Sequence, residues 1–276
     1  MAGGDVTEGV VRVGDTVRRP LGPNAPLIHA LLEHLEQVGF SGAPRFLGID
    51  RAGREVLTFV EGEVAGRPHP PWIADESRLV SVGRLLRAYD DAAATFVVPA
   101  QVTPDLGYVE TPDLPPSPPY EPELIGHVDI TPENVVFRDG EAYALIDFDL
   151  AKPATRVDEV VNALRYWGPI ADPADVDQRL AGVDVARRCR LFADAYGLSG
   201  TDRAKVVEVA AMRLRRSWHL MKQRAEMDGG GWLRMWNEGV GDRIRRAQTW
   251  LDHHGPAIDA ALQPPQQGKS SGWWGL

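Results

Sequence analysis

The chain has little cysteine, no long apolar run and little basic charge. Its 276 residues include one cysteine, Cys189, so no internal disulfide can form and nothing requires an oxidising compartment. No stretch approaches the roughly 18 consecutive apolar residues of a transmembrane helix. The N-terminal MAGGDVTEG has neither a basic region nor an apolar segment, so we expect no signal peptide. These absences predict a soluble, cytoplasmic protein that does not bind membranes.

Basic residues are outnumbered by acidic ones. The chain has 30 Lys and Arg against 39 Asp and Glu, a net charge of −9 and a pI near 5.3. Because nucleic-acid binding relies on a basic surface, we expect no nucleic-acid partner. The composition, 43% apolar and 25% charged, is that of an ordinary globular protein. The length allows one large domain or two lobes.

The most informative stretch covers residues 125–152, IGHVDITPENVVFRDGEAYALIDFDLAK. In it Asp129 is followed by Asn134 and, after a predicted hairpin, by Asp147. An Asp that accepts the proton of an attacking hydroxyl, then an Asn and an Asp that hold Mg²⁺, are the groups that phosphoryl transfer from a nucleotide requires. The hairpin would return Asp147 to Asn134, so both could bind one hard cation.

The side chains of this stretch suit different roles. Asp129 is the predicted catalytic base, because a carboxylate can accept a hydrogen bond from a substrate hydroxyl and orient it. His127, two residues before Asp129, is not the predicted base. Asp149 either reaches the metal or caps the helix that follows, and the sequence leaves both open. The predicted metal ligands are therefore Asn134, Asp147 and Asp149.

The motifs HVDITPEN and IDFD resemble HGDxxxxN and IDxD of the aminoglycoside phosphotransferase (APH)-like kinases, a family that includes choline, homoserine and fructosamine kinases. The N-terminal part is most similar to a short-N-lobe bacterial subgroup around trifolitoxin immunity proteins. The resemblance implies an α+β, two-lobed, protein-kinase-like fold with a shortened antiparallel-sheet N-lobe and a large helical C-lobe. It also implies ATP or GTP as co-substrate, with Mg²⁺, and a His127 that braces the catalytic loop by hydrogen bonding.

The same stretch resembles the protein-kinase pair HRDLKPEN and DFGLAK, but two substitutions argue against a protein kinase. Val128 replaces the Arg of HRD, and Asp149 replaces the Gly of DFG. No A-P-E follows, and a helical pattern resumes soon after Asp147, where a protein kinase needs a longer activation segment. The doubled acid of DFD is the small-molecule-kinase form.

The resemblance implies an N-lobe over 1–61 and a C-lobe over 62–262, because strands, a helix and strands follow in the order of a kinase N-lobe. The tail over 263–276 is polar and rich in Gly and Pro, which predicts disorder. The N-lobe patterns predict a hairpin over 10–20, a helix over 24–38 and a second hairpin over 44–60. In the C-lobe, helices are predicted over 73–94, 158–167, 174–197, 201–228 and 231–253. The proline-rich segment 97–122 is predicted to be irregular.

Nucleotide contacts are expected from two parts of the N-lobe. Gly3 and Gly4 resemble a remnant of the glycine-rich turn over the phosphates, or else form a flexible leader. Adenine is expected to meet the backbone of the segment between the lobes, which comprises Thr58, Phe59, Val60 and Glu61.

The family's strand lysine is missing from this chain. Arg18 occupies the matching place and is the predicted phosphate clamp, because Arg binds phosphate bidentately and stays charged. Its neighbour Arg19 is then expected to face solvent or the helix, since adjacent strand residues point to opposite faces. The acidic partner is unclear, with Glu33 one candidate and His29 nearer the expected place.

The predicted function is Mg²⁺-dependent transfer of the γ-phosphoryl group of ATP or GTP to a hydroxyl of a small molecule. The resemblance places the acceptor pocket among late helices, with lining candidates Asp158, Glu159, Tyr166, Trp167, Trp218 and Trp236. The alternative is a non-catalytic, kinase-like binding or immunity-type protein, suggested by the short N-lobe and the missing lysine. The sequence names neither the acceptor nor the oligomeric state.

Overall fold

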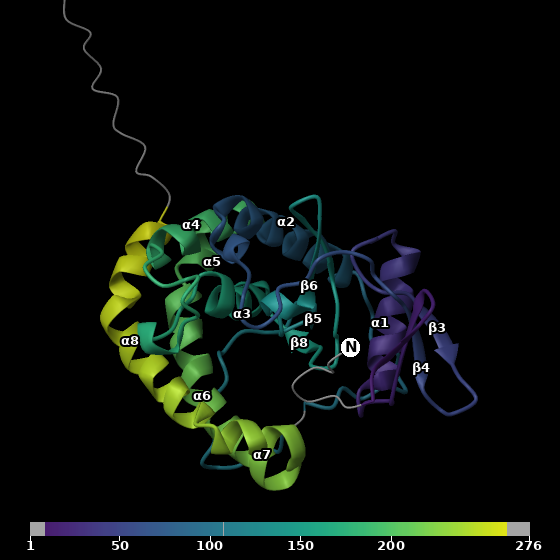
Figure 1. Cartoon of the computed structure of the whole chain (residues 1–276). Helices are drawn as coiled ribbons and strands as arrows, with labels where there is room; N and C mark the ends of the chain where they lie inside the picture. The colour runs from purple at the N-terminus through teal and green to yellow at the C-terminus, as the bar shows by residue number, and fades with distance from the viewer. Residues whose placement is uncertain (1–8, 107, 264–276) are drawn as a thin grey trace, which may run out of the picture.

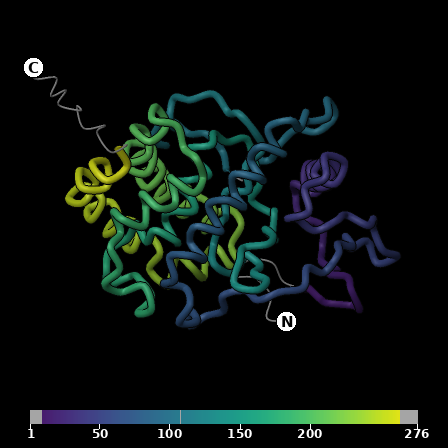
Figure 2. Tube along the Cα trace, turned by 90° about the horizontal axis from the view of Figure 1, so that it is seen from above, coloured from purple at the N-terminus to yellow at the C-terminus, as the bar shows by residue number. Residues whose placement is uncertain are grey.

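The computed structural model describes residues 9–106 and 108–263. A small antiparallel sheet with one helix lies beside a larger, mostly helical part (Figure 1), and the view from above shows the two side by side (Figure 2). This is the predicted two-lobed α+β fold. The predictions for Gly3, Gly4 and residues 264–276 lie outside the described residues.

The N-terminal lobe is a four-stranded antiparallel sheet in the order β1-β2-β4-β3. Its elements are β1 (Val11–Val13), β2 (Thr16–Arg19), α1 (Ala25–Gln37), β3 (Phe46–Ile49) and β4 (Glu55–Thr58). Both predicted hairpins and the helix are confirmed. The first turn contains Gly14, whose φ of 60° suits a residue without a side chain. Leucines at helical spacing, Leu27, Leu31 and Leu35, give α1 a fully buried face.

The chain crosses between the lobes just after β4. Glu63 forms an isolated antiparallel bridge with Phe137, its N–H donating to the Phe137 carbonyl at 2.9 Å. Gly62 makes this close approach possible. A Cβ there would lie 2.4 Å from Val136 Cγ1 and 2.6 Å from the Phe137 oxygen, and its φ is 150°. The crossing is therefore attached to the strand that contains Phe137, which follows the predicted catalytic loop, residues 127–134.

The C-terminal lobe packs helices around two short antiparallel ribbons, β5 with β8 and β6 with β7. In chain order its elements are η1 (Pro71–Ala74), α2 (Glu76–Ala93), β5 (Leu124–Gly126), η2 (Pro132–Asn134), β6 (Val135–Arg138), β7 (Glu141–Leu145), β8 (Lys152–Ala154), α3 (Arg156–Trp167), η3 (Pro173–Asp175), α4 (Val185–Tyr196), α5 (Gly200–Arg203), α6 (Val206–Met227), α7 (Gly230–Asn237) and α8 (Val240–Leu262).

Three helix predictions in this lobe were wrong in part. The helix predicted over 201–228 is interrupted at residues 204–205, which form a turn between α5 and α6. The helix predicted over 174–197 begins only at α4, where the Asp184 carboxylate accepts the Arg187 N–H at 2.9 Å and caps it. The helix predicted over 231–253 is broken at Gly239, whose φ is 83°. The prediction of an irregular segment after α2 is confirmed, since residues 97–106 and 108–122 contain no helix or strand.

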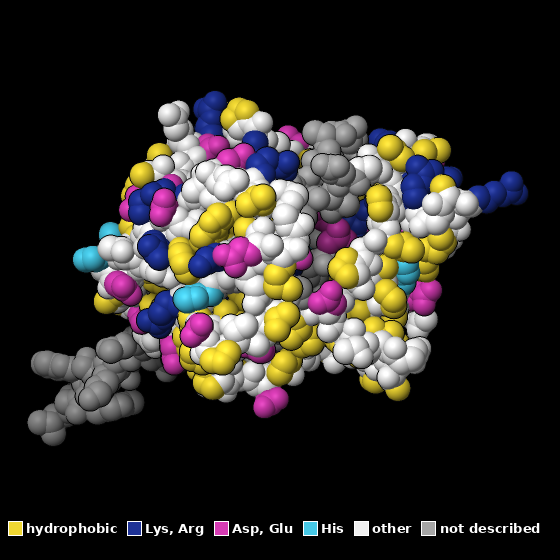
Figure 3. Space-filling view, turned by 90° about the horizontal axis from the view of Figure 1, so that it is seen from below, with side chains coloured by type: hydrophobic (Ala, Val, Ile, Leu, Met, Phe, Trp, Pro, Cys, Tyr) yellow, Lys and Arg dark blue, Asp and Glu magenta, His cyan; other side chains and the backbone are white. Residues whose placement is uncertain are grey.

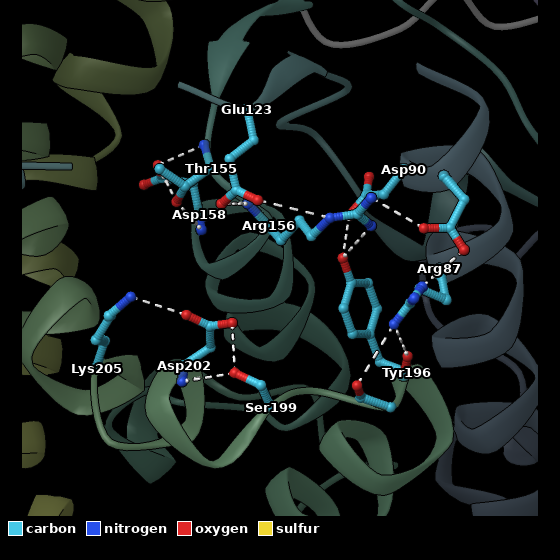
Figure 4. A network of polar contacts seen from close by, with 12 residues as sticks. Arg87, Asp90, Glu123, Thr155, Arg156, Asp158, Tyr196, Ser199, Asp202 and Lys205 are labelled. Carbon is cyan, nitrogen blue, oxygen red and sulfur yellow. Dashed lines mark hydrogen bonds and ion pairs between the residues drawn. The ribbon is translucent and has the colours of Figure 1, made fainter. Parts of the chain in front are cut away.

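A polar network joins α2, α3 and α4 behind the ribbons (Figure 4). The buried Tyr196 hydroxyl donates to Asp90 Oδ2 at 2.5 Å. Arg156, the first residue of α3, reaches Asp91 at 2.9 Å and Glu123 at 3.6 Å. These contacts fix the N-terminal end of α3, the helix that supports the catalytic loop.

Charge is mixed on the face of the molecule that is seen from below. On the face seen in Figure 3, acidic, basic and apolar side chains of the described residues are interspersed, without a continuous basic surface. Among the described residues, no helix has the length and apolar character to cross a membrane.

Candidate active site

The catalytic loop leaves β5 at Gly126 and begins with a buried histidine. His127 Nε2 lies 2.9 Å from the Ile146 carbonyl, and its Nδ1 accepts the Asp129 N–H at 3.3 Å. Burial lowers the His127 pKa to about 4, so the ring is neutral near neutral pH and donates from Nε2. His127 thus joins the loop to the segment that carries Asp147, consistent with a brace rather than a base.

The next residue, Val128, has a φ of 52°, in the left-handed region that β-branched residues avoid. Such a conformation costs on the order of 1–3 kcal/mol and persists only where its surroundings enforce it. Here α3 does so. The Glu159 carboxylate accepts the N–H groups of His127 and Val128 at 2.9 and 2.8 Å. The Asn162 side chain donates to the Val128 carbonyl at 2.6 Å and accepts the Ile130 N–H at 2.7 Å.

This clamp corrects part of the predicted acceptor lining. Glu159 and Trp167 are fully buried, and the Trp167 indole donates to the Ile130 carbonyl at 3.0 Å. Both support the catalytic loop from behind and face no acceptor. Asn162, which is not among the predicted site residues, also holds the loop through the Val128 carbonyl and the Ile130 N–H. Its position one helical turn after Asp158 carries no motif that would have revealed it.

The turn at Val128 places the Asp129 carboxylate within hydrogen-bond distance of the Asn134 side chain. The Asn134 amide donates to Asp129 Oδ2 at 2.8 Å and to the Asp129 carbonyl at 3.0 Å. Burial, and secondly the charge of Asp147, raise the Asp129 pKa to about 7, while the Asn134 hydrogen bond opposes them. A carboxyl group that ionises near neutral pH suits proton transfer from a hydroxyl.

Asp147 and Asp149 meet an arginine from the other lobe. Arg19 lies 2.9 Å from Asp147 Oδ1 and 2.6 Å from Asp149 Oδ1, and its Nε donates to Glu55 at 2.5 Å. Only 6% of Arg19 is exposed. Asp147 itself has a φ of 65°, a second strained residue in the site. One buried guanidinium therefore connects β2, β4 and the segment after β7.

The structure corrects the orientation predicted for the two arginines of β2. Arg18 was expected to face the phosphates, but its guanidinium lies 3.3 Å from Asp50 on the other face of the sheet. Arg19 faces the site instead. The prediction was wrong by one residue, which on a strand reverses the side chain's direction. The partner acid is also different, because Glu55 comes from β4 and is itself 2.8 Å from His29 of α1.

The predicted nucleotide-base segment lies at the crossing between the lobes, and its residues are Thr58, Phe59, Val60 and Glu61. The Phe59 N–H donates to the Asp15 carbonyl at 2.8 Å, and the Glu61 carbonyl accepts from Arg138 at 2.8 Å. The Val60 backbone makes no hydrogen bond to any described residue. Its N–H and carbonyl are therefore available to a ligand.

Three oxygen-bearing side chains lie where the metal was predicted. Asn134 uses its amide nitrogen on Asp129, and no described residue donates to its Oδ1. Asp147 and Asp149 add carboxylates, each about a third exposed. Among the described residues no three His, Cys, Asp or Glu side chains alone could hold a metal ion. A Mg²⁺ ion fits this donor set when phosphate oxygens complete its coordination, as in nucleotide kinases.

One cavity lies away from these groups. It measures about 330 Å³, lies between the segment after α3 and α8, and is lined almost entirely by apolar residues such as Val176, Leu180 and Ile258. Its lining includes two ionisable residues, and both already have partners: the Asp184 carboxylate caps α4, and His254 Nδ1 lies 2.9 Å from the Trp250 carbonyl. The chemistry is therefore better assigned to the catalytic loop.

Comparison with known proteins agrees with this geometry. Residues 105–192, which contain the catalytic loop and α3, match the phosphotransferase enzyme family, APH. The chain is 30% identical over 271 residues to the trifolitoxin immunity protein of Rhizobium leguminosarum bv. trifolii, a match that covers 92% of this chain and 94% of that protein.

Solved structures show the same fold at low sequence identity. A choline/ethanolamine kinase family protein from Mesorhizobium loti superposes with a TM-score of 0.56 at 17% identity, covering 94% of this chain and 90% of that one. Amicoumacin kinase hAmiN, solved with AMP-PNP, Ca²⁺ and Ami, gives a TM-score of 0.56 at 11% identity, with coverage of 90% and 89%. The chain belongs to the APH phosphotransferase enzyme family and is a homologue of the trifolitoxin immunity protein.

Proposed function

We propose that this protein transfers the γ-phosphoryl group of ATP or GTP to a hydroxyl of a small molecule, with Mg²⁺. The observation that carries the proposal is the pairing of Asp129 with Asn134 on a strained loop, beside Asp147 and the buried Arg19. We place the lobe boundary at residues 61 and 62, so that the nucleotide lies between the lobes.

In this reaction Asp129 accepts the proton of the acceptor hydroxyl as its oxygen bonds to the γ-phosphorus. The bond between that phosphorus and the β,γ-bridging oxygen breaks, and the nucleoside diphosphate leaves with the electron pair. Asn134 holds the Asp129 carboxylate through its amide, so the base is oriented before the acceptor binds. His127 and Glu159 keep the loop in place from behind.

The metal would be held by Asn134 Oδ1, Asp147 and Asp149. Bound there, Mg²⁺ supplies positive charge that stabilises the phosphate oxygens during transfer. Arg19 offsets part of the mutual repulsion of Asp147 and Asp149.

Arg19 is also the proposed phosphate clamp, in place of the family's lysine. Its planar fork suits phosphate, and Glu55 with His29 fixes its orientation from behind. The free backbone groups of Val60 are the proposed contacts for the nucleotide base. The covering role of Gly3 and Gly4 stays a prediction.

A second candidate is a non-catalytic binding or immunity-type protein. It is favoured by the relative at 30% identity, which is an immunity protein, and by the replacement of the strand lysine. The paired Asp129 and Asn134 favour catalysis, because binding alone does not need a base with a pKa near 7.

Calorimetric titration with ATP and GTP, with and without Mg²⁺, tests the proposal. We expect Mg²⁺-dependent binding that Asp147→Ala removes and Asp252→Ala, a change at an exposed residue of α8, preserves. Asp129→Ala should keep nucleotide binding and lose turnover. Failure of the wild-type protein to bind either nucleotide would overturn the kinase assignment, and turnover unchanged by Asp129→Ala would overturn the role of the base.

A further inference from the structure

We propose that the acceptor carries an anionic group, a carboxylate or a phosphate, which Arg165, Arg213 and Ser217 bind between α3 and α6. This inference rests on the proposed function and adds the charge of its substrate.

The proposed subsite is a small cavity between two helices. It measures about 40 Å³ and is lined by Val161, Asn162, Arg165, Ile170, Ala210, Arg213, Leu214 and Ser217. Pockets that enclose a whole drug-sized ligand measure roughly 300 Å³ or more. The space therefore suits one functional group of an acceptor whose remainder lies outside. Its polar atoms come mainly from two guanidinium groups, an amide and a hydroxyl, so it offers chiefly donors.

The cavity adjoins the catalytic loop. Asn162, one of its walls, holds the Val128 carbonyl and the Ile130 N–H, the residues on either side of Asp129. Arg165 lies close enough to Asp129 for its charge to favour the ionised carboxylate. An anion bound here would keep the rest of a small acceptor near the base.

The cations around the cavity exceed the acids that pair with them. Arg165 makes no hydrogen bond or ion pair with any described residue, and Arg213 has one acidic partner, Asp158, at 2.9 Å. That carboxylate also accepts the Thr155 N–H and hydroxyl at 3.1 and 2.8 Å. Lys152 of β8 lies nearby, has no ion pair among the described residues, and has a pKa lowered to about 8 by burial and by Arg213.

Two other arginines of α6 have acidic partners, while Arg215 lies exposed on the surface. Arg216 pairs with Glu110, and Arg224 pairs with Asp228 at 2.8 Å. Around this cavity Lys152 and Arg165 have no ion pair among the described residues, and Arg213 shares Asp158 with Thr155, in a chain whose net charge is −9. A guanidinium fork binds carboxylate or phosphate through two parallel hydrogen bonds, and the apolar walls at Val161 and Leu214 strengthen such bonds.

Anion binding can be measured without turnover. We would label the full chain with ¹⁵N-arginine, follow the Nε–H signals by NMR, and titrate with inorganic phosphate and, separately, with acetate. The Arg165 and Arg213 signals, assigned from Arg165→Gln and Arg213→Gln, should shift saturably. Each variant should weaken that binding at least tenfold. Arg215→Gln, which removes an equal charge from an exposed position on α6, should leave it unchanged. The anion that binds more tightly identifies the group.

Matched acceptors give the second measurement. Glycerate against its primary amide, and glycerol 3-phosphate against glycerol, differ in charge but keep a hydroxyl. The anionic member should be bound at least tenfold more tightly. Signals of Arg165 and Arg213 that shift no more than those of surface arginines, or equal binding of both members, would overturn the inference. Nucleotide binding measured in parallel separates that result from failure of the kinase assignment.

Discussion

At the scale of single residues, the site depends on groups whose ionisation the fold opposes. Asp129 is buried beside Asp147, so its pKa rises to about 7, and His127 is buried so that its pKa falls to about 4. Near neutral pH the loop therefore carries a neutral histidine, the proposed brace, and a carboxyl group that loses its proton near pH 7, the proposed base. Neither pKa shift could be predicted from the residue types alone, because both shifts come from burial and neighbouring charge.

The pKa of Asp129 predicts the pH dependence of catalysis. Below about pH 7 the carboxyl is protonated and cannot accept a proton, so kcat/KM should rise about tenfold per pH unit and level off above pH 7. Mg²⁺ at Asp147 would favour the ionised form and shift the rise to lower pH. A pH profile on the preferred acceptor checks this. A rate independent of pH between about pH 4 and 8 would contradict the assignment of Asp129 as base.

The two arginines of β2 form a matched pair of variants. Arg19→Gln removes the charge that faces Asp147 and Asp149, and we expect Mg·ATP to bind at least tenfold more weakly, about 1.4 kcal/mol. Arg18→Gln removes an equal charge that faces Asp50, and affinity should change less than twofold. Calorimetry measures both. Equal losses would show a general charge effect, and a larger loss in Arg18→Gln would restore the sequence-based prediction.

At the scale of elements, the site is built from short strands and a loop that α3 supports through hydrogen bonds. The β5–β8 ribbon, with three residues in each strand, was not predicted, because strands this short carry too few residues to show a period. α3 was predicted, but its role was not. It carries Glu159 and Asn162, which hold the strained catalytic turn.

The crossing between the lobes makes a prediction at this scale. Gly62→Ala would place a Cβ 2.6 Å from the Phe137 carbonyl at a φ of 150°, so we expect a loss of about 2–4 kcal/mol in the free energy of unfolding. Gly66→Ala, with no atom within 4 Å of its Cβ and no positive φ, should change stability by less than about 0.5 kcal/mol. Urea unfolding measures both. Equal free energies of unfolding for Gly62→Ala and Gly66→Ala would show that the backbone at the crossing relaxes around the added methyl group.

At the scale of the whole molecule, buried ionisable groups set how stability varies with pH. Burial raises the pKa of Asp129 and Glu159 to about 7, and raises that of Asp90 well above its ordinary value. The folded chain therefore holds protons that the unfolded chain has lost above about pH 4, and this stabilisation disappears as pH rises. His127 acts oppositely, since its lowered pKa costs stability as pH falls below about 6.5.

Above pH 6.5 the carboxyl contributions dominate, and Lys152, whose pKa is lowered to about 8, opposes them only in small part. We therefore expect the free energy of unfolding to fall by on the order of 2 kcal/mol between about pH 6.5 and 8. Urea unfolding at the two pH values checks the direction. Asp90→Asn should flatten the slope, because it removes one of the ionising groups. Stability that increases over this interval would contradict the pKa directions on which the prediction rests.

The sequence by itself determined the family, the two-lobed fold and the chemistry-bearing residues of the catalytic loop, because contiguous motifs preserve their spacing. Only the tertiary structure decided that Arg19 rather than Arg18 faces the site, that Glu55 and His29 support it, and that α3 clamps Val128. These contacts join residues far apart in the chain. They depend on strand register and helix rotation, where a shift of one residue changes the partner.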